Sequence, residues 1–139
     1  MIRYFDASAL VKRYATEAGS VAVRRLMRDP VATSRLSEVE IASALVRLAR
    51  DGALSTTERD RALQRLTVDF QSFWVVETTR EVVALARTAL VRHSLRTGDA
   101  LQLASCQYLR HALSENVPMV VFDDRLLRAA RDAGVPIVP

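Results

Sequence analysis

Five short apolar runs, each separated from the next by a longer stretch, constrain the fold of this chain more than any other feature. Each run has the length and composition of a β-strand, and the runs occupy residues 2–5, 31–34, 73–76, 119–122 and 135–138. Strands that alternate with helices favour an α/β fold with a mainly parallel sheet. A wholly apolar run such as MVVF also fits a strand that is buried on both faces. We therefore expect a short parallel sheet that is covered on both faces.

Helical signals fill the stretches between these runs. Apolar residues at helical spacing predict a helix over 37–50. The capping pairs Ser55 with Glu58 and Thr78 with Glu81 predict the starts of two more helices. The remaining helices are expected over about 7–15, then to about 28, from about 98 onward, and over about 123–133.

Length and composition favour one domain over residues 1–139, because half of the residues are hydrophobic and suffice for a single core. The one cysteine, Cys106, excludes an internal disulfide and a cysteine-based metal cluster. The first residues are too charged for the apolar region of a signal peptide, and no apolar run approaches the roughly 18 residues that span a bilayer. We expect a soluble, cytoplasmic protein.

The basic residues comprise 19 arginines and one lysine, and the net charge is +4. They are spread along the chain, with no block of five or more like charges. A modestly basic surface favours a polyanion such as RNA or DNA, and the planar guanidinium group suits phosphate. The alternative is that these arginines only solvate helix faces, and a net charge this small does not decide between the two.

Four acidic residues stand where a parallel sheet could gather them. Asp6 directly follows the first strand and Asp123 directly follows MVVF, so both belong to the carboxyl edge of the sheet. Sites in such sheets form outside that edge. Glu40, three residues after Ser37, and Asp99 are both expected in the first turns of helices. All four acids therefore lie at predicted helix starts.

Each of these acids also has a purely structural explanation. Asp6 and Asp123 could cap the helices that follow them, Glu40 could belong to a capping box, and Asp99 could complement a helix dipole. If the sheet instead brings the four to one rim, their like charges repel and raise their pKa values. A hard divalent cation such as Mg²⁺ or Mn²⁺, which prefers oxygen ligands, would relieve that repulsion.

The residues for other kinds of site are missing. His93 and His111 lie far apart in the sequence and are expected on helix surfaces, so no nucleophile and histidine pair is supported. Cys106 is expected to be a small buried hydrophobic residue. The four glycines are isolated, so there is neither a P-loop nor a dinucleotide-binding fingerprint.

The four acids lie in the segments FDASALVKRY, SEVEIASALVR, LRTGDALQLASC and VVFDDRLLRAARDAGVPIV. In this order and spacing, the segments resemble the PIN-domain family and, within it, the VapC-type toxins of bacterial type II toxin-antitoxin pairs. The resemblance places the acids of the family at Asp6, Glu40, Asp99 and Asp123, with Ser8 beside the first. It extends from residue 3 to residue 138.

This resemblance implies a PIN-like three-layer α/β sandwich with Mg²⁺- or Mn²⁺-dependent ribonuclease activity on RNA. It also implies a homodimer that is neutralised by a cognate antitoxin protein, and exposed apolar positions on the helical hairpin over 38–70 could form the dimer contact. Asp6, Glu40 and Asp99 would hold one or two metal ions, with Asp123 completing the cluster. One position departs from the family pattern, because Val121 stands where Ser or Thr is usual.

Two other interpretations remain open. The same fold with poor metal affinity could be a weakly active or inactive module that binds RNA or a partner protein, and Val121 makes this possible. A response-regulator receiver also gathers acids at strand ends, but it needs a lysine after a late strand, and the only lysine here is Lys12. For an RNA substrate, Lys12, Arg13 and Arg96 are candidates to contact the backbone.

Overall fold

The computed structural model describes residues 1–139, and its five strands form one parallel sheet in the order β3-β2-β1-β4-β5. The strands are β1 (Arg3–Phe5), β2 (Val31–Ser34), β3 (Trp74–Val76), β4 (Met119–Val120) and β5 (Ile137–Val138). All five predicted strands are confirmed, although most are shorter than expected. The run predicted over 119–122 ends as a strand at Val120, and one further backbone hydrogen bond joins Val121 to Val138.

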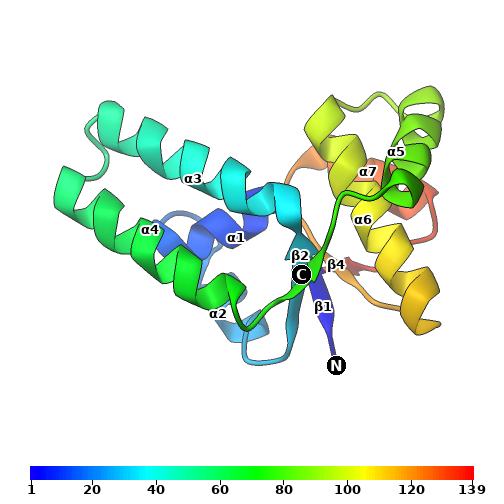
Figure 1. Cartoon of the computed structure of the whole chain (residues 1–139), viewed down its shortest axis with the longest axis horizontal. Helices are drawn as coiled ribbons and strands as arrows, with labels where there is room; N and C mark the ends of the chain where they lie inside the picture. The colour runs from blue at the N-terminus through cyan, green and yellow to red at the C-terminus, as the bar shows by residue number, and fades with distance from the viewer.

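Seven helices cover the two faces of this sheet. They are α1 (Ala7–Tyr14), α2 (Ser20–Leu26), α3 (Arg35–Arg50), α4 (Thr56–Phe70), α5 (Arg80–Arg92), α6 (Thr97–Leu113) and α7 (Asp124–Asp132). Figure 1 shows α1 to α4 on one side of the sheet and α5 to α7 on the other, which is the three-layer α/β sandwich that was expected. No helix has both the length and the apolar character needed to cross a membrane.

The core lies in two clusters, one in each helical layer, and β1 supplies side chains to both. Tyr4 packs into the cluster with Leu103 of α6, whereas the next residue, Phe5, packs into the cluster with Leu10 and Leu45. Successive side chains of a strand point to opposite faces, so the central strand is buried on both sides. The sheet is thereby held in a fixed position between the two layers.

Two helix starts differ from the sequence prediction. Helix α3 begins at Arg35, because the Ser34 side chain accepts a hydrogen bond from the backbone N–H of Leu36 and caps it. The predicted capping box of Ser37 and Glu40 is therefore wrong, and Glu40 lies in the second turn of the helix. Helix α5 is capped by Thr79 instead of Thr78. The capping box of α4 is confirmed.

Strand β1 is the central strand, and the chain extends the sheet first on one side of it and then on the other. The chain adds β2 and then β3 on one side of β1, and it crosses back to place β4 and then β5 on the other. In open parallel sheets, ligands bind outside the carboxyl ends of the strands at such a switch point. A ligand site is therefore expected at the segments that follow β1 and β4.

Candidate active site at the carboxyl edge of the sheet

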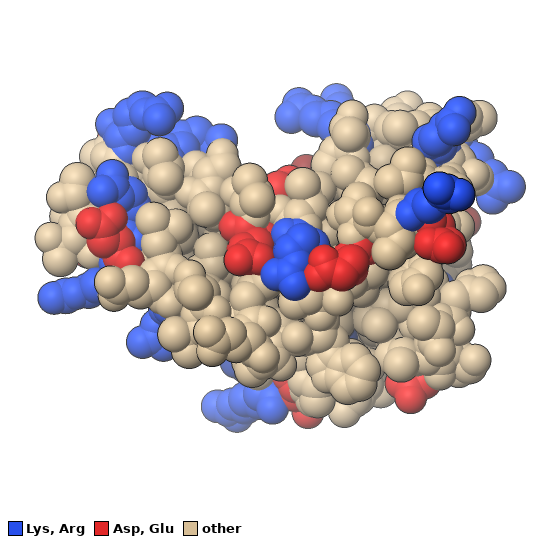
Figure 2. All heavy atoms as spheres, viewed as in Figure 1, with Lys and Arg blue, Asp and Glu red and all other residues tan.

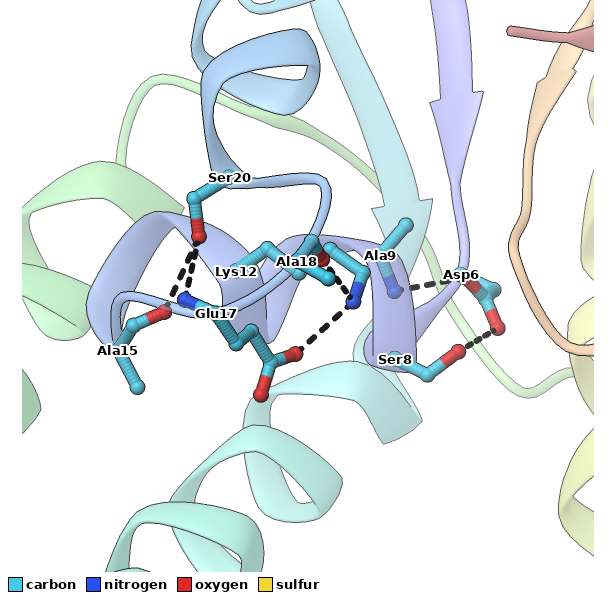
Figure 3. Close-up of polar contacts among 8 residues, drawn as sticks. All are labelled: Asp6, Ser8, Ala9, Lys12, Ala15, Glu17, Ala18 and Ser20. Atoms are coloured by element: carbon cyan, nitrogen blue, oxygen red, sulfur yellow. Dashed lines mark hydrogen bonds and ion pairs between the residues drawn. The ribbon is translucent and has the colours of Figure 1, made fainter. Parts of the chain in front are cut away.

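Asp6 follows β1 at the switch point, and both of its carboxylate oxygens accept hydrogen bonds. Oδ1 accepts from the backbone N–H of Ala9 at 2.9 Å, and Oδ2 accepts from the Ser8 hydroxyl at 2.7 Å. Figure 3 shows these contacts at the junction of β1 and α1. Asp6 thus caps α1, as the structural explanation predicted, and the cap holds its carboxylate in one orientation.

The environment of Asp6 opposes its negative charge. The residue is 3% exposed, and this burial raises the pKa of its carboxyl group to about 6. The hydrogen bonds from Ser8 and Ala9 lower the pKa in part, while the nearby charges of Asp99 and Glu40 raise it further. Helix capping alone does not explain why two acids from distant segments lie near Asp6.

Glu40 reaches the site from α3 and is held there by a buried hydrogen-bond network. Its Oε1 accepts from the side-chain amide of Gln102 at 2.9 Å, and that amide also donates to the Ser37 hydroxyl. Tyr4 donates to the amide oxygen of Gln102 at 2.6 Å, and the hydroxyls of Ser37 and Thr33 are hydrogen-bonded to each other. Burial and the charge of Asp99 raise the pKa of Glu40, and the Gln102 hydrogen bond lowers it.

Asp99 and Asp123 approach from the opposite helical layer. Asp99 lies in the first turn of α6, where burial and the charge of Asp123 raise its pKa, and the charges of Arg96 and Arg125 lower it. Asp123 caps α7, and its Oδ1 accepts the backbone N–H of Leu126 at 2.9 Å. The other oxygen of Asp123 accepts no hydrogen bond from the protein.

These acids surround a cavity of about 640 Å³ that no hydrophobic side chain lines. We call it the acidic cavity; its lining residues are Glu40, Arg96, Gly98, Asp99, Asp123, Asp124, Arg125 and Arg128. Three of the four predicted acids line it, whereas Asp6 is buried beside it and does not. Figure 2 shows acidic side chains at the bottom of the hollow between the two helical layers, with basic side chains on both sides.

The donor set fits a hard divalent cation better than any other metal. Every candidate ligand is a carboxylate oxygen, and the raised pKa values of Asp6, Glu40 and Asp99 are what poorly solvated carboxylates with other acids in their neighbourhood produce. No three acidic, histidine or cysteine side chains are close enough to form a ready-made metal site. Mg²⁺ keeps several waters and is commonly bound through one or two carboxylates plus substrate phosphate, so an open arrangement suits it.

Several residues of this site were not identified from the sequence. Gln102 lies one helical turn after Asp99, and this spacing on one helix face is the signal that could have found it. Arg125 follows two residues after Asp123. Gly98 belongs to the site because a Cβ there would lie 3.2 Å from Oε2 of Glu40.

The structure also sorts the other sequence candidates. Lys12 donates to Glu17 at 3.0 Å and to the carbonyl of Ala18, and Arg13 is paired with Asp69, so neither lines the acidic cavity. Arg96 does line it. Val121 is buried within the core and brings no polar group to the acids.

Comparisons with known proteins agree with this geometry. The chain matches the PIN domain family over residues 3–132. It is 36% identical to "Ribonuclease VapC49" of Mycobacterium tuberculosis in an alignment that covers 98% of this chain and 94% of that protein. Its fold is similar to a chain of a toxin-antitoxin complex from Klebsiella pneumoniae, with a TM-score of 0.68 and 17% identity over 99% of this chain and 96% of that chain.

A second solved structure with the same fold is M. tuberculosis VapC20, described as a sarcin-ricin loop cleaving toxin, with a TM-score of 0.67 and 20% identity. That match covers 93% of this chain and 95% of the other. The family match spans the positions of all four predicted acids, and the relative is similar over nearly its entire length. The chain therefore belongs to the PIN-domain family and is one of its VapC-type members.

Proposed function

We propose that this protein is a metal-dependent endoribonuclease that hydrolyses RNA phosphodiester bonds at the acidic cavity. The observation that carries the proposal is the meeting of Asp6, Glu40 and Asp99 at the switch point of the sheet, where burial raises the pKa of each and the charge of at least one neighbouring acid raises it further. The relative VapC49 is named a ribonuclease, which supports the proposal. Poorly solvated carboxylates whose charges are unfavourable without a cation, beside a cavity that a polymer can enter, suit phosphodiester hydrolysis.

The residues of this chain would divide the work as follows. Asp6, Glu40 and Asp99 would hold Mg²⁺ or Mn²⁺, with Asp123 as a further ligand. A bound divalent ion supplies a Lewis acid at the phosphoryl oxygen and lowers the pKa of bound water. Ser8 and Gln102 keep the carboxylates of Asp6 and Glu40 oriented through their hydrogen bonds.

The arginines that line the acidic cavity address a second difficulty of the site, which is that carboxylates repel the phosphates of a substrate. Arg96, Arg125 and Arg128 stand beside the acids in this cavity. A guanidinium group binds phosphate oxygens through paired hydrogen bonds. These side chains would therefore hold the RNA backbone against the repulsion from the acids.

We further propose that the protein is the toxin of a type II toxin-antitoxin pair, acts in the cytoplasm, and forms a homodimer. The similar Klebsiella pneumoniae chain is part of a toxin-antitoxin complex, which supports an antitoxin partner. The dimer proposal is supported by exposed apolar residues on the hairpin of α3 and α4, where Val39 and Val68 are 67% and 63% exposed. Ile41 and Leu66 of the same hairpin are buried in the core and are not available for such a contact.

The test is cleavage of a labelled single-stranded RNA by the purified protein with MgCl₂ or with a chelator. We expect cleavage that requires the metal and that is lost in Asp6→Asn and Asp99→Asn, because both changes remove a ligand charge and preserve side-chain shape. Asp51→Asn, at the far end of α3, is the matched control and should cleave normally. Wild-type rates in Asp6→Asn would show that the site assignment is wrong.

A second candidate function is a weakly active or inactive PIN-like module that binds RNA or a partner protein. Two observations favour it: Val121 contributes no polar group to the fourth acid, and the acids form no closed cluster of three. The same assay separates the candidates. RNA that is bound but never cut, with MgCl₂ or MnCl₂, would favour the module over the nuclease.

A further inference from the structure

A second, larger cavity adjoins the acidic cavity, and three arginines line both. It has a volume of about 900 Å³ and lies between helix α7 and the segment 90–96, which comprises the last residues of α5 and the connection to α6. The shared side chains are Arg96, Arg125 and Arg128. A polymer held in the acidic cavity can therefore continue into this neighbour, which we call the arginine cavity.

The arginine cavity carries the opposite charge to the acidic one. Arg92 joins the three shared arginines in its lining, and the only acid there is Asp132. None of these four guanidinium groups forms an ion pair with a carboxylate of the protein, although six other ion pairs are present. Unpaired arginines that converge on one hollow are suited to a ligand with several anionic groups.

The lining also includes surfaces that suit a nucleobase. Leu90 and Val91 are 42% and 88% exposed, and the half-buried ring of His93 follows them. Single-stranded RNA is recognised by contacts of its unstacked bases with flat or apolar side chains together with cationic contacts to the backbone. A cavity of this size falls within the usual range for sites that bind small organic groups.

Resting on the function proposed above, we infer that the arginine cavity is a substrate subsite that binds the RNA nucleotides adjoining the scissile phosphodiester. Arg92 and Arg128 bind backbone phosphate, and the segment 90–95 contacts a base. An acidic protein segment could meet the same charges. RNA is favoured because the two cavities share three side chains, so that a strand bound at the acidic cavity lies next to the arginine cavity.

Arg92→Gln is the decisive variant, because Arg92 lines the arginine cavity and not the acidic one. Arg87→Gln is the matched control: Arg87 lies on the same helix, is exposed, and lines neither cavity. The probe is a fluorescent 12-nucleotide RNA in chelator, which prevents cleavage. One lost phosphate contact should weaken binding about fivefold at about 0.1 M salt and reduce the slope of log affinity against log salt by about 0.7.

Cleavage kinetics give an independent measurement on the same variants. Arg92→Gln should raise the KM for this RNA with MgCl₂ and leave kcat unchanged, since its side chain is away from the acids. Equal loss of affinity in Arg87→Gln, or an unchanged salt slope in Arg92→Gln, would overturn the subsite. So would an acidic peptide of glutamates that binds in an Arg92-dependent way while the RNA does not.

The two proposals fail in different ways. If wild-type protein does not cleave RNA with any divalent metal, the proposed ribonuclease function fails. If wild-type protein cleaves RNA and Arg92→Gln has normal affinity, salt slope and KM, only the subsite fails. Thermal unfolding of Arg92→Gln, whose side chain is exposed, should match that of wild type and confirms that the comparison is between folded proteins.

Discussion

Asp6 shows how one residue can serve the fold and oppose it at once. Its Oδ1 caps α1, which stabilises the helix, yet burial raises the pKa of the same carboxyl group to about 6. An ionised Asp6 is therefore a cost to the folded protein at neutral pH. The residue is better explained by the proposed role in metal binding than by its contribution to stability.

This conflict predicts that Asp6→Asn stabilises the metal-free protein at high pH. Because the folded pKa lies above the ordinary value of 3.8, wild type keeps its full stability below about pH 4 and loses it as the pH rises through about 6. The asparagine variant, which cannot ionise, should be more stable by up to about 3 kcal/mol at pH 8 and equal at pH 4. Urea unfolding in chelator at both pH values measures this.

Glu77→Gln provides a control of opposite sign. Arg35 lowers the pKa of Glu77 by donating hydrogen bonds to it, so this carboxylate stabilises the fold above its ordinary pKa and loses that effect as the pH falls. The pair is exposed, so removing it should cost less than about 1 kcal/mol at pH 8. An Asp6→Asn difference that is the same at pH 4 and pH 8 would contradict the prediction.

For individual residues, the sequence indicated the acids of the candidate site but not the side chains that hold those acids in position. Asp6 and Asp123 follow apolar strands directly, and a local pattern of that kind is visible in one dimension. The contact between Glu40 and Gln102 joins residues 62 positions apart. It depends on how α3 and α6 cross, which no local pattern encodes.

Among the elements, α3 and α6 matter most because they carry Glu40 and Asp99 from opposite layers. Gln102 on α6 bridges them, and its amide is satisfied on both sides by Tyr4, Ser37 and Glu40. Buried polar groups that are fully paired fix the relative position of the elements that hold them. The two helices are thereby held in the register that brings their acids to one cavity.

Replacing Gln102 with Met should weaken both the fold and the site. The buried hydroxyl of Tyr4 loses its acceptor and Glu40 loses its donor, so the free energy of unfolding should fall by about 1–3 kcal/mol. Since this hydrogen bond lowers the pKa of Glu40, its loss should also move the acidic limb of the pH–rate profile to higher pH. Chemical denaturation and RNA cleavage between pH 5 and pH 9 measure the two effects.

Gln107→Met is the matched control, because Gln107 lies on the same helix and makes no side-chain hydrogen bond. It should leave both the stability and the pH–rate profile close to wild type. An unshifted profile in Gln102→Met, despite reduced stability, would mean that Gln102 supports only the fold and does not position Glu40.

The elements themselves were predicted well, and their ends less well. Alternating apolar and helical segments sufficed for five parallel strands and the helices between them. The start of α3 was misplaced because Ser34 and Ser37 are equally good caps locally. The structure uses Ser37 for the buried contacts with Thr33 and Gln102, which leaves Ser34 as the cap.

Over the whole molecule, the candidate site lies where the two helical layers meet at the carboxyl edge of the sheet. Asp6 and Glu40 come from the layer of α1 to α4, and Asp99 and Asp123 come from the layer of α5 to α7 (Figure 1). A cation bound between them would contact both layers at once. Its binding energy would then add to the stability of the entire fold and not to one local segment.

This arrangement predicts that MgCl₂ or MnCl₂ raises the unfolding temperature of the protein in the absence of RNA. A ligand at a hundred times its Kd stabilises the native state by about 2.7 kcal/mol, which corresponds to roughly 10 °C for a chain of this length. Asp99→Asn should lose most of the rise, because it removes a ligand from one layer. Calorimetry at pH 8, with and without each metal, provides the measurement.

Glu81→Gln tests whether the effect belongs to the acidic cavity. Like Asp99, Glu81 is an acid in the first turn of a helix, but it is exposed on α5 and does not line the cavity. Glu81→Gln should retain the full metal-induced rise in unfolding temperature. If the metal acted only through surface charge, replacing either acid would reduce the rise by the same amount. An equal loss of the rise in Glu81→Gln and Asp99→Asn would therefore remove the case for a cation held between the two layers.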